Sequence, residues 1–329
     1  MQSRTKFCMQ IIRHLDEISE PFKRAVVTIG NFDGVHLGHQ ALFHEVIEKA
    51  DTIDGTSIAI TFEPHPMRVL NGASQPPLIT ILDQKIELIE RLDIDVLIVV
   101  PFTRQFAALT PREFVEDVLI RKIGMVAIVV GKDYTFGRNR QGTVGMLKTF
   151  AELFDFELLL ADWIGSNRDP EGRISSTRIR DLVNDGKVDE VHPLLGRYYQ
   201  IRGSVTTGRN RGGRLLGFPT ANIILQDELC PKTGVYAVTV VCEDQQFDGV
   251  ANIGYSPTFD DNLFTVEVYI LDFDRNIYGQ IIRVNFIKRI RDELKFSGIA
   301  ELSEQIEKDV IEARAVLSKA VHVLNKADE

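Results

Sequence analysis

The sequence predicts two domains: a doubly wound α/β domain with a parallel sheet, followed by a small antiparallel β-barrel with a C-terminal helix. The 329 residues exceed the usual length of a single domain. The first half alternates short β-branched runs with longer amphipathic stretches, whereas the second half has short strand-like runs separated by glycines and Asp/Asn pairs. The helical pattern breaks near Gly186, so we expect domains of residues 1–186 and 187–329.

The first domain is expected to hold a parallel sheet that is covered on both faces. Its strands are predicted at Ala25–Ile29, Ser57–Phe62, Asp95–Val100, Val126–Val130 and Phe156–Leu160. Its helices are predicted at Gly38–Ala50, Asp83–Leu92, Pro111–Lys122 and Thr143–Phe154. Strands that are apolar on both faces and separated by helices are typical of such a sheet. Ligands of these sheets bind at the carboxyl ends of the strands, which is where we look for a site.

The second domain is expected to be an antiparallel barrel or sandwich. Its strands are predicted at Tyr199–Thr206, Gly234–Val241, Phe247–Ile253, Phe264–Leu271 and Gln280–Phe286. No helical stretch interrupts them, which favours an all-β arrangement. One amphipathic helix is predicted at Ala300–Leu324, with the apolar stripe Ile306, Val310, Ala313 and Leu317. We expect this helix to cover the barrel.

Composition and charge exclude several classes of protein. The net charge of −9 argues against a general binder of nucleic acid or anionic membranes. The three cysteines, Cys8, Cys230 and Cys242, lack C-x-x-C spacing, so we expect reduced thiols and neither a disulfide framework nor a zinc site. The first residues have no long apolar stretch, and the run Val96–Val100 is too short to cross a bilayer. We therefore expect a cytoplasmic protein.

A glycine-rich turn after the first predicted strand is a candidate anion site. Gly30, Gly34 and Gly38 allow close approach of the backbone to a ligand, and the following helix offers its N-terminus. His36 and His39 are three residues apart, so they share a face of the first helical turn. Two imidazoles there could donate hydrogen bonds to phosphate oxygens during transfer. The alternatives are histidines that cap the helix or bind a metal.

A second candidate phosphate site precedes a short predicted helix near the end of the first domain. The segment Ser175-Ser176-Thr177-Arg178 offers hydroxyls, free N–H groups and a guanidinium. Ser176 or Thr177 could cap the helix. The alternative for this segment is a charged, capped surface helix.

These two segments resemble the nucleotidyltransferase superfamily. His36-Leu37-Gly38-His39 is similar to its HxGH signature, and the segment Arg173 to Arg180 is similar to its element that clamps the ATP phosphates. The resemblance implies transfer of a nucleotidyl group from ATP without a covalent intermediate. It implies His36, His39 and Arg178 as catalytic residues. It implies ATP contacts from Gly30, Asn31, Phe32, Asp33, Gly38, Ser175, Ser176 and Thr177.

Two aromatic segments follow the second and fourth predicted strands. Thr61–Pro66 and Gly131–Arg138 could stack on a flat ring, and Asp133 could accept from ring N–H groups. The alternative is an aromatic core with a polar loop. Both segments resemble elements of the FMN adenylyltransferase domain of bacterial riboflavin kinase/FAD synthetases, with Tyr134 where that family more often has Phe. The resemblance implies flavin contacts from Phe62, Pro64, His65, Asp133 and Phe136.

A basic, glycine-rich loop opens the second domain. Gly208, Arg211, Arg214 and Gly217 are expected to hold the phosphates of ATP. Thr220 and Asn222 are two residues apart, so they share a face of an extended segment, and their oxygens suit Mg²⁺. The alternative is a basic surface hairpin.

Glu267 interrupts an apolar strand, and burial of a charge needs a reason. Alternation places Glu267, Tyr269 and Leu271 on one face, and the alternative is an outward-facing carboxylate. The string Gly217 to Asn222 resembles the signature of the riboflavin kinase domain, a six-stranded barrel. This resemblance continues through Arg291. It implies that Glu267 is a general base toward the ribityl hydroxyl and that Arg291 contacts flavin.

Together the two resemblances imply a bifunctional enzyme of flavin cofactor synthesis. Riboflavin would be phosphorylated by ATP to FMN, and FMN would be adenylylated to FAD with release of pyrophosphate. Mg²⁺ is the expected cofactor. The expected partners are riboflavin, FMN and ATP, without nucleic acid or membrane, in a monomer or weak homo-oligomer. The alternatives are a single-activity adenylyltransferase whose barrel only binds ligand, and a flavin-binding protein without enzymatic activity.

Overall fold

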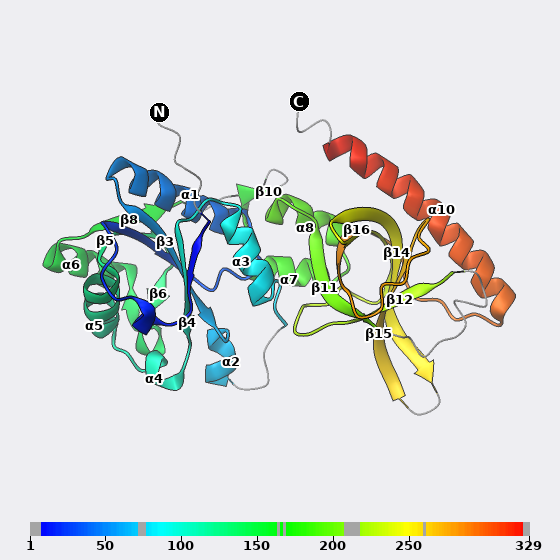
Figure 1. Cartoon of the computed structure of the whole chain (residues 1–329), viewed down its shortest axis with the longest axis horizontal. Coiled ribbons are helices and arrows are strands. Elements are labelled where there is room, and N and C mark those ends of the chain that lie inside the picture. The colour runs from blue at the N-terminus through cyan, green and yellow to red at the C-terminus, as the bar shows by residue number, and fades with distance from the viewer. Residues whose placement is uncertain are drawn as a thin grey trace. The chain divides into compact units, whose positions relative to one another are not determined.

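The chain folds into two compact units (Figure 1). The structure is a computed structural model, and it describes residues 8–71, 77–162, 165–166, 169–206, 218–258 and 261–324. The first unit comprises Met1–Pro76 and Thr80–Ser175, and the second comprises Pro77–Ile79 and Ser176–Glu329. The units thus divide before Gly186, because α7 (Ser176–Asn184) packs on α8 (Val188–Leu195) and α8 packs on strands of the second unit.

The first unit is built on a six-stranded parallel sheet, which confirms the predicted α/β class. The strand order is β1-β4-β3-β2-β5-β8. The strands are β1 (Gln10–Ile12), β2 (Ala25–Ile29), β3 (Thr56–Glu63), β4 (Val96–Pro101), β5 (Met125–Gly131) and β8 (Glu157–Ala161). The edge strand β1 escaped prediction because it has three residues and only Ile12 is buried.

Helices cover both faces of this sheet. The α-helices of the unit are α1 (Leu37–Thr52), α2 (Pro66–Asn71), α3 (Leu82–Glu90), α4 (Arg104–Ala107), α5 (Pro111–Glu113) and α6 (Val144–Phe154). The smaller elements are η1 (Leu15–Glu17), η2 (Phe114–Ile123), η3 (Arg138–Arg140), β6 (Thr135–Phe136), β7 (Gly142–Thr143), β9 (Gly165–Ser166) and β10 (Asp169–Arg173).

Each face of the sheet has its own hydrophobic core. One core joins the sheet to η2 and α6 through residues such as Leu119 and Leu147. The other joins the sheet to α1 and α3 through Phe43, Val46 and Ile89. All five of these side chains are fully buried. Strands between two cores read as continuous apolar runs, and this explains why their positions were predictable.

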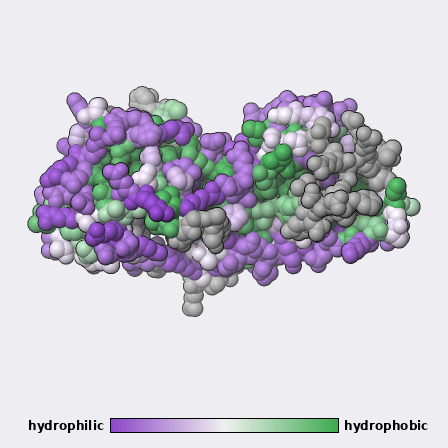
Figure 2. Space-filling view, turned by 90° about the horizontal axis from the view of Figure 1, so that it is seen from below, coloured by the Kyte–Doolittle hydropathy of each residue, from purple (hydrophilic) through white to green (hydrophobic). Residues whose placement is uncertain are grey.

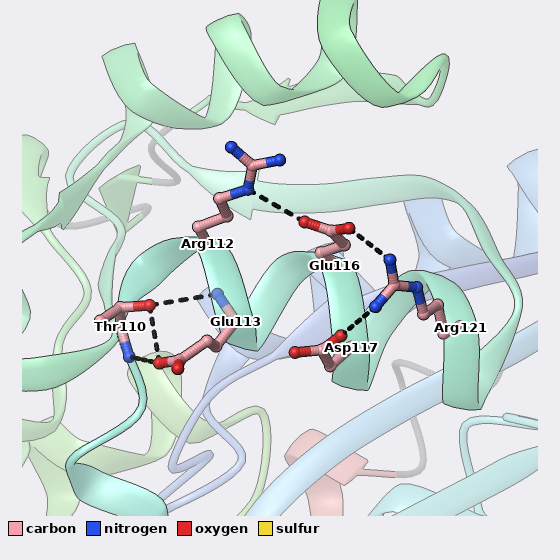
Figure 3. Close-up of polar contacts among 6 residues, drawn as sticks. All are labelled: Thr110, Arg112, Glu113, Glu116, Asp117 and Arg121. Carbon is pink, nitrogen blue, oxygen red and sulfur yellow. Dashed lines mark hydrogen bonds and ion pairs between the residues drawn. The ribbon is translucent and has the colours of Figure 1, made fainter.

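The predicted helix over residues 111–122 forms as α5 followed by the π-helical segment η2. A capping box begins it: the Glu113 amide donates to the Thr110 hydroxyl, and the Thr110 amide donates to the Glu113 carboxylate at 2.8 Å (Figure 3). Ion pairs then join Arg112, Glu116, Asp117 and Arg121 along the exposed side (Figure 3). Exposed pairs add little stability, so buried apolar residues fix the position of this helix.

The second unit is a closed antiparallel barrel, as predicted. The strand order is β11-β12-β15-β14-β13-β16. The strands are β11 (Tyr199–Thr206), β12 (Thr220–Ile224), β13 (Gly234–Cys242), β14 (Gln245–Thr258), β15 (Asp261–Ile270) and β16 (Ile281–Arg291). Closure pairs the edges of the sheet with each other, so the barrel needs no further strand to satisfy its backbone.

The C-terminal helix α10 (Ile299–Leu324) lies on the barrel, as predicted. Ala313 and Leu317 are buried against Val235, Ala237 and Val250 of β13 and β14. The helix therefore covers the outer face of these strands.

Hydrophilic residues dominate the face seen in Figure 2, with hydrophobic residues gathered in smaller areas of each unit. Among the described residues, none of the helices has the length and apolar character needed to span a bilayer.

Candidate active sites

The histidine pair lies at the start of α1, directly after the turn that follows β2. His36 is the N-cap of α1, and its Nδ1 accepts a hydrogen bond of 3.2 Å from the His39 amide. The two imidazoles are stacked, with ring centroids 3.6 Å apart and planes 16° apart. Because Nδ1 of His36 is an acceptor, a neutral His36 carries its proton on Nε2. The predicted shared face is thus observed, and so is the capping role that was its alternative.

Gly38 leaves room for this arrangement. A Cβ atom at Gly38 would lie 3.1 Å from two atoms of the His36 ring. Few real Cβ contacts are that short, so a side chain at Gly38 would push the imidazole away. The absence of a side chain at Gly38 therefore helps to fix the position of His36. The predicted contact of Gly38 with ATP stays a prediction.

The turn before α1 has a strained backbone. Phe32 and Val35 have φ values of 46° and 40°, in the left-handed region that disfavours such side chains. The Thr80 amide donates to Asp33 Oδ1 at 3.1 Å, and the Gly34 amide donates to the Thr80 hydroxyl at 3.0 Å. These bonds hold the strained turn from the segment that leads into α3.

Phe32 and Asp33 were predicted to contact ATP, but their side chains are buried. Phe32 is 1% exposed, and its ring packs edge-on against His39 with centroids 5.3 Å apart. Asp33 is 3% exposed and accepts from the Thr80 amide. Any contact of these two residues with ATP would therefore come from their backbone atoms. Their side chains instead stabilise the turn that precedes His36 and His39.

Burial also affects the charge of His39. Burial holds the pKa of His39 well below its ordinary value, and the neighbouring His36 and Lys85 add to this effect. His39 is therefore neutral at physiological pH. Its Nδ1 is buried without a hydrogen-bond partner among the described residues. A neutral imidazole can still donate one hydrogen bond to a phosphate oxygen.

Lys85 belongs to this site, although sequence reasoning did not find it. Its side chain is buried in α3, and its Nζ donates to the Asn31 carbonyl at 2.7 Å. The Thr61 hydroxyl donates to the same carbonyl at 3.2 Å. A signal was present: Lys85 lies four residues after Ile81 and four before Ile89, on the apolar stripe of the helix. Lysine is rarely buried at such positions.

Aromatic rings gather at the carboxyl ends of β3 and β4. The Phe62 ring lies 5.5 Å from that of Phe102 and 6.0 Å from that of Phe106. Phe62 was predicted to contact flavin, whereas Phe102 and Phe106 were not identified. Pro64 is exposed beside them, and His65 is half-buried, with its Nδ1 accepting from the Met67 amide at 3.3 Å. The structure thus provides an apolar surface at the ligand edge of the sheet.

The second segment predicted to contact flavin, Gly131–Arg138, has some residues in the core and others at the surface. Phe136 is 6% exposed within the core, and the half-buried Tyr134 is stacked on it, with ring centroids 5.6 Å apart. Burial raises the pKa of Tyr134, so its hydroxyl stays protonated. Asp133 is exposed and forms an ion pair of 2.8 Å with Arg173. The aromatic-core alternative thus holds for Phe136, and a flavin contact of Asp133 stays a prediction.

The Ser175–Arg178 segment lies at a helix start, as expected. Because α7 begins at Ser176, the N-cap position falls on Ser175, so the prediction that Ser176 or Thr177 caps the helix is wrong. Thr177 is exposed, and Ser176 and Arg178 are half-buried in the first turn. Their predicted roles toward ATP stay predictions.

The barrel aligns the predicted metal and base residues across neighbouring strands. On β12, Thr220 and Asn222 are half-buried, whereas Ala221 and Ile223 are buried. Asn222 lies directly opposite Glu267 of β15, and Thr220 lies opposite Tyr269. On the other side of β15, Glu267 lies opposite Asn252. Residues opposite each other in antiparallel strands share a face, so these side chains form one polar row.

Glu267 has the properties expected of a proton acceptor. It is half-buried between the buried Val266 and Val268, and burial raises the pKa of its carboxyl group. No hydrogen bond to its carboxylate occurs among the described residues. Asn252 was not assigned a role from the sequence, although it faces Glu267. Its amide could orient the carboxylate or a substrate.

The predicted magnesium site rests on oxygen donors of this polar row. The Thr220 hydroxyl and the Asn222 amide oxygen are hard ligands on one face of β12, which fits Mg²⁺. The part of the chain that the structure describes holds no cluster of three His, Cys, Asp or Glu that could bind a metal. The predicted ATP residues Gly208, Arg211, Arg214 and Gly217 lie outside the described residues.

Arg291 has a structural partner. Its Nε and Nη2 donate to the Asp309 carboxylate of α10 at 2.8 and 2.6 Å, and its Nη1 donates to the Asp292 carbonyl. The Asp309 side chain is 4% exposed. Arg291 therefore fastens α10 to the end of β16, and its predicted contact with flavin stays a prediction.

Two family models match this chain, one in each half of the sequence. The family model described as FAD synthetase matches residues 18–178, and the model described as riboflavin kinase matches residues 195–317. The two models define the class: a FAD synthetase region and a riboflavin kinase region in one chain. The boundary predicted at Gly186 lies between them and stays a prediction.

Curated relatives match nearly the whole chain. The bifunctional riboflavin kinase/FMN adenylyltransferase of Haemophilus influenzae is 39% identical over 93% of this chain and 99% of its own length. That of Listeria monocytogenes is 40% identical over 89% of this chain and 93% of its own length. The chain belongs to the bifunctional riboflavin kinase/FMN adenylyltransferase family.

A solved structure shares the fold. A crystal structure titled as a macrolide-efflux protein from Streptococcus pneumoniae is 34% identical and has a TM-score of 0.82, with 94% of this chain and 99% of that one covered.

Proposed function

We propose that this chain makes FAD from riboflavin in two ATP-dependent steps, one in each unit. The barrel unit phosphorylates riboflavin to FMN, and the α/β unit adenylylates FMN to FAD. The observation that carries the proposal is the stacked pair His36 and His39 at the helix start after β2, together with the Asn222–Glu267 pair on the barrel. Two phosphate-transferring sites in separate units suit two successive steps.

In the first step, the ribityl terminal hydroxyl of riboflavin attacks the γ-phosphorus of ATP. A new O–P bond forms, the bond between the γ-phosphorus and the bridging oxygen breaks, and ADP leaves. Glu267 positions the hydroxyl and accepts its proton, and its raised pKa suits a proton acceptor near neutral pH. Thr220 and Asn222 would hold Mg²⁺, which when bound supplies positive charge to the phosphates of ATP.

In the second step, a phosphate oxygen of FMN attacks the α-phosphorus of ATP. The bond between the α- and β-phosphates breaks, and pyrophosphate leaves. Nε2–H of His36 donates to phosphate oxygens on which charge develops, and the neutral His39 donates beside it. Arg178 is the predicted third donor. No side chain forms a covalent bond, so the catalytic effect comes from positioning and charge stabilisation.

The aromatic surface supports a flavin as the acceptor. Phe62, Phe102 and Phe106 lie at the carboxyl ends of β3 and β4, where a flat apolar ring can stack. A single-activity adenylyltransferase for another phosphorylated precursor gives no reason for these rings. A flavin-binding protein without activity gives no reason for the stacked imidazoles.

We further propose that the enzyme works in the cytoplasm on small molecules alone, as a monomer or weak homo-oligomer. The net charge of −9 supports the absence of nucleic-acid and anionic-membrane partners.

The test is incubation with riboflavin, ATP and Mg²⁺, followed by chromatography with flavin fluorescence detection. Wild type should form FMN and then FAD. His36→Ala should lose FAD formation by roughly 10²-fold or more and still form FMN, because it removes one charge-stabilising donor. Glu267→Gln should lose FMN formation and still convert added FMN into FAD. His44→Ala changes an exposed histidine of the same helix and should match wild type.

Loss of both activities in either folded variant would contradict the assignment of one step to each unit.

A further inference from the structure

Lys85 is a buried cation next to the turn that precedes His36 and His39, and the mechanism above does not use it. Its residue is 3% exposed within α3. Among the described residues, its only hydrogen-bond partner is the neutral carbonyl of Asn31, at 2.7 Å. Burial of an ammonium is costly unless the charge or its hydrogen bond is used. A residue such as Met would fill the same space on the apolar stripe without that cost.

The hydrogen bond from Lys85 to the Asn31 carbonyl lies at the start of the turn that leads to His36 and His39, which we call the histidine turn (residues 31–35). Phe32 and Val35 follow Asn31 with left-handed φ values, and such strain persists only where neighbours hold the backbone. Thr80 fixes the turn a second time through Asp33 and Gly34. Thr80 and Lys85 both belong to the segment that leads into and forms the first turn of α3. The Thr61 hydroxyl of β3 also donates to the Asn31 carbonyl, at the longer distance of 3.2 Å.

Loss of the hydrogen bond from Lys85 to the Asn31 carbonyl would change the positions of the His36 and His39 imidazoles. Phe32 lies next to Asn31 in the chain, and its ring contacts the His39 ring at 5.3 Å between centroids. A change in the backbone of Phe32 would move that ring and remove the support of His39. His39 is stacked on His36, so both donors would lose their positions.

We propose that Lys85 is a positioning residue for adenylyl transfer, which holds the Asn31 carbonyl and through it the turn that carries His36 and His39. This inference rests on the proposed function. It assigns to Lys85 no contact with a substrate. Burial lowers the pKa of the Lys85 ammonium, and the nearby Asp33 and Glu63 carboxylates partly offset this effect.

The test compares Lys85→Met, Lys85→Gln and the control Lys49→Met. Lys85→Met removes the donor, whereas Lys85→Gln can still donate to the Asn31 carbonyl without a charge. Lys49 lies on α1 of the same unit and forms an ion pair with Glu157 of β8, in which the side chains are 21% and 52% exposed. The kcat and KM of FMN adenylylation are measured for each variant, with the riboflavin kinase rate of the same sample as internal reference.

Lys85→Met should lower the kcat of adenylylation roughly 10- to 100-fold, because misplacement of catalytic groups by about 1 Å has an effect of this size. Lys85→Gln should keep a larger share of kcat than Lys85→Met. Lys49→Met should match wild type, and the kinase rate should stay the same in all variants.

A spectroscopic readout separates positioning from a loss of folding. The Lys85 charge contributes to the low pKa of His39, together with burial and His36. In Lys85→Met, an NMR titration should therefore show the pKa of His39 moving up toward its ordinary value, with the spectrum of a folded protein.

Two results would overturn the inference. One is an unchanged kcat in folded Lys85→Met, and the other is an equal loss in the Met and Gln variants, because the bond to Asn31 would then be irrelevant. If Lys85→Met does not fold, Lys85→Gln decides alone: retained kcat supports the inference, and a loss beyond about 10-fold overturns it. Failure of wild type to form FAD would instead refute the proposed function.

Discussion

The ion pair between Arg291 and Asp309 provides a quantitative test of what holds α10 on the barrel. The Arg291 and Asp309 side chains are 19% and 4% exposed, and two hydrogen bonds join them. Gln305 also donates to the Asp309 carboxylate, at 2.9 Å. Asp309→Asn would leave the guanidinium without its counter-charge at a nearly buried position.

The expected cost follows from this burial. Removal of one partner from a fully buried pair costs about 3–5 kcal/mol. Arg291 is partly exposed and can reach water, so we expect the lower end, about 3 kcal/mol. For a unit of roughly 150 residues, 1 kcal/mol corresponds to about 2–4 °C in Tm, so the second unit should melt roughly 6–12 °C lower.

The assay is differential scanning calorimetry of Asp309→Asn and of the control Glu304→Gln. Glu304 pairs with Lys308 on the same helix, but both side chains are more than half exposed, so the control should change Tm by only about 1 °C. A Tm of Asp309→Asn equal to that of the control would refute the reasoning. A riboflavin KM that rises in Arg291→Met but not in Asp309→Asn would instead support the predicted flavin contact of Arg291.

Other substitutions test the two sites. Gly38→Ala should lower FAD formation at least roughly 10-fold with little change in Tm, because the new Cβ would lie 3.1 Å from the His36 ring; unchanged adenylylation kinetics would count against this. Glu267→Gln should raise the Tm of the second unit at neutral pH while kinase activity is lost. Burial raises the pKa of Glu267, so its protonated form stabilises the fold at low pH, and this stabilisation is lost as pH rises through the folded-state pKa. Calorimetry at acidic and neutral pH should show the gain only at neutral pH, and no gain there would contradict the burial of the charge.

Much of the fold was predictable because hydrophobic periodicity is strong in both units. The buried strands of the first sheet are mostly apolar on both faces, and β15 alternates as expected, with Val266 and Val268 buried and Glu267 half-buried. The strand β1 was missed because three residues carry too little pattern. The π-helical turns of η2 were also missed, since an apolar stripe does not distinguish them from an α-helix.

The sites were predictable where chemistry depends on local spacing. His36 and His39 are neighbours in one helical turn, so their proximity follows from the sequence alone. Lys85 and Asn252 reach their sites only through tertiary packing and strand register. For the same reason, the sequence left open whether Phe136 is buried in the core, and the pairing of Arg291 with Asp309 was not foreseen. Residue type and spacing along the sequence do not show which distant helix or strand will pack against a given loop.

A mixing experiment tests most directly whether the two halves of the chain perform separate, successive transfers. His36→Ala and Glu267→Gln proteins are incubated with riboflavin and ATP, first separately and then together, and FAD is quantified over time. We expect no FAD from either variant alone and rapid FAD formation from the mixture, because FMN released by the first variant is the substrate of the second. A mixture that makes no FAD, although each protein is folded, would contradict the assignment of one transfer to each unit.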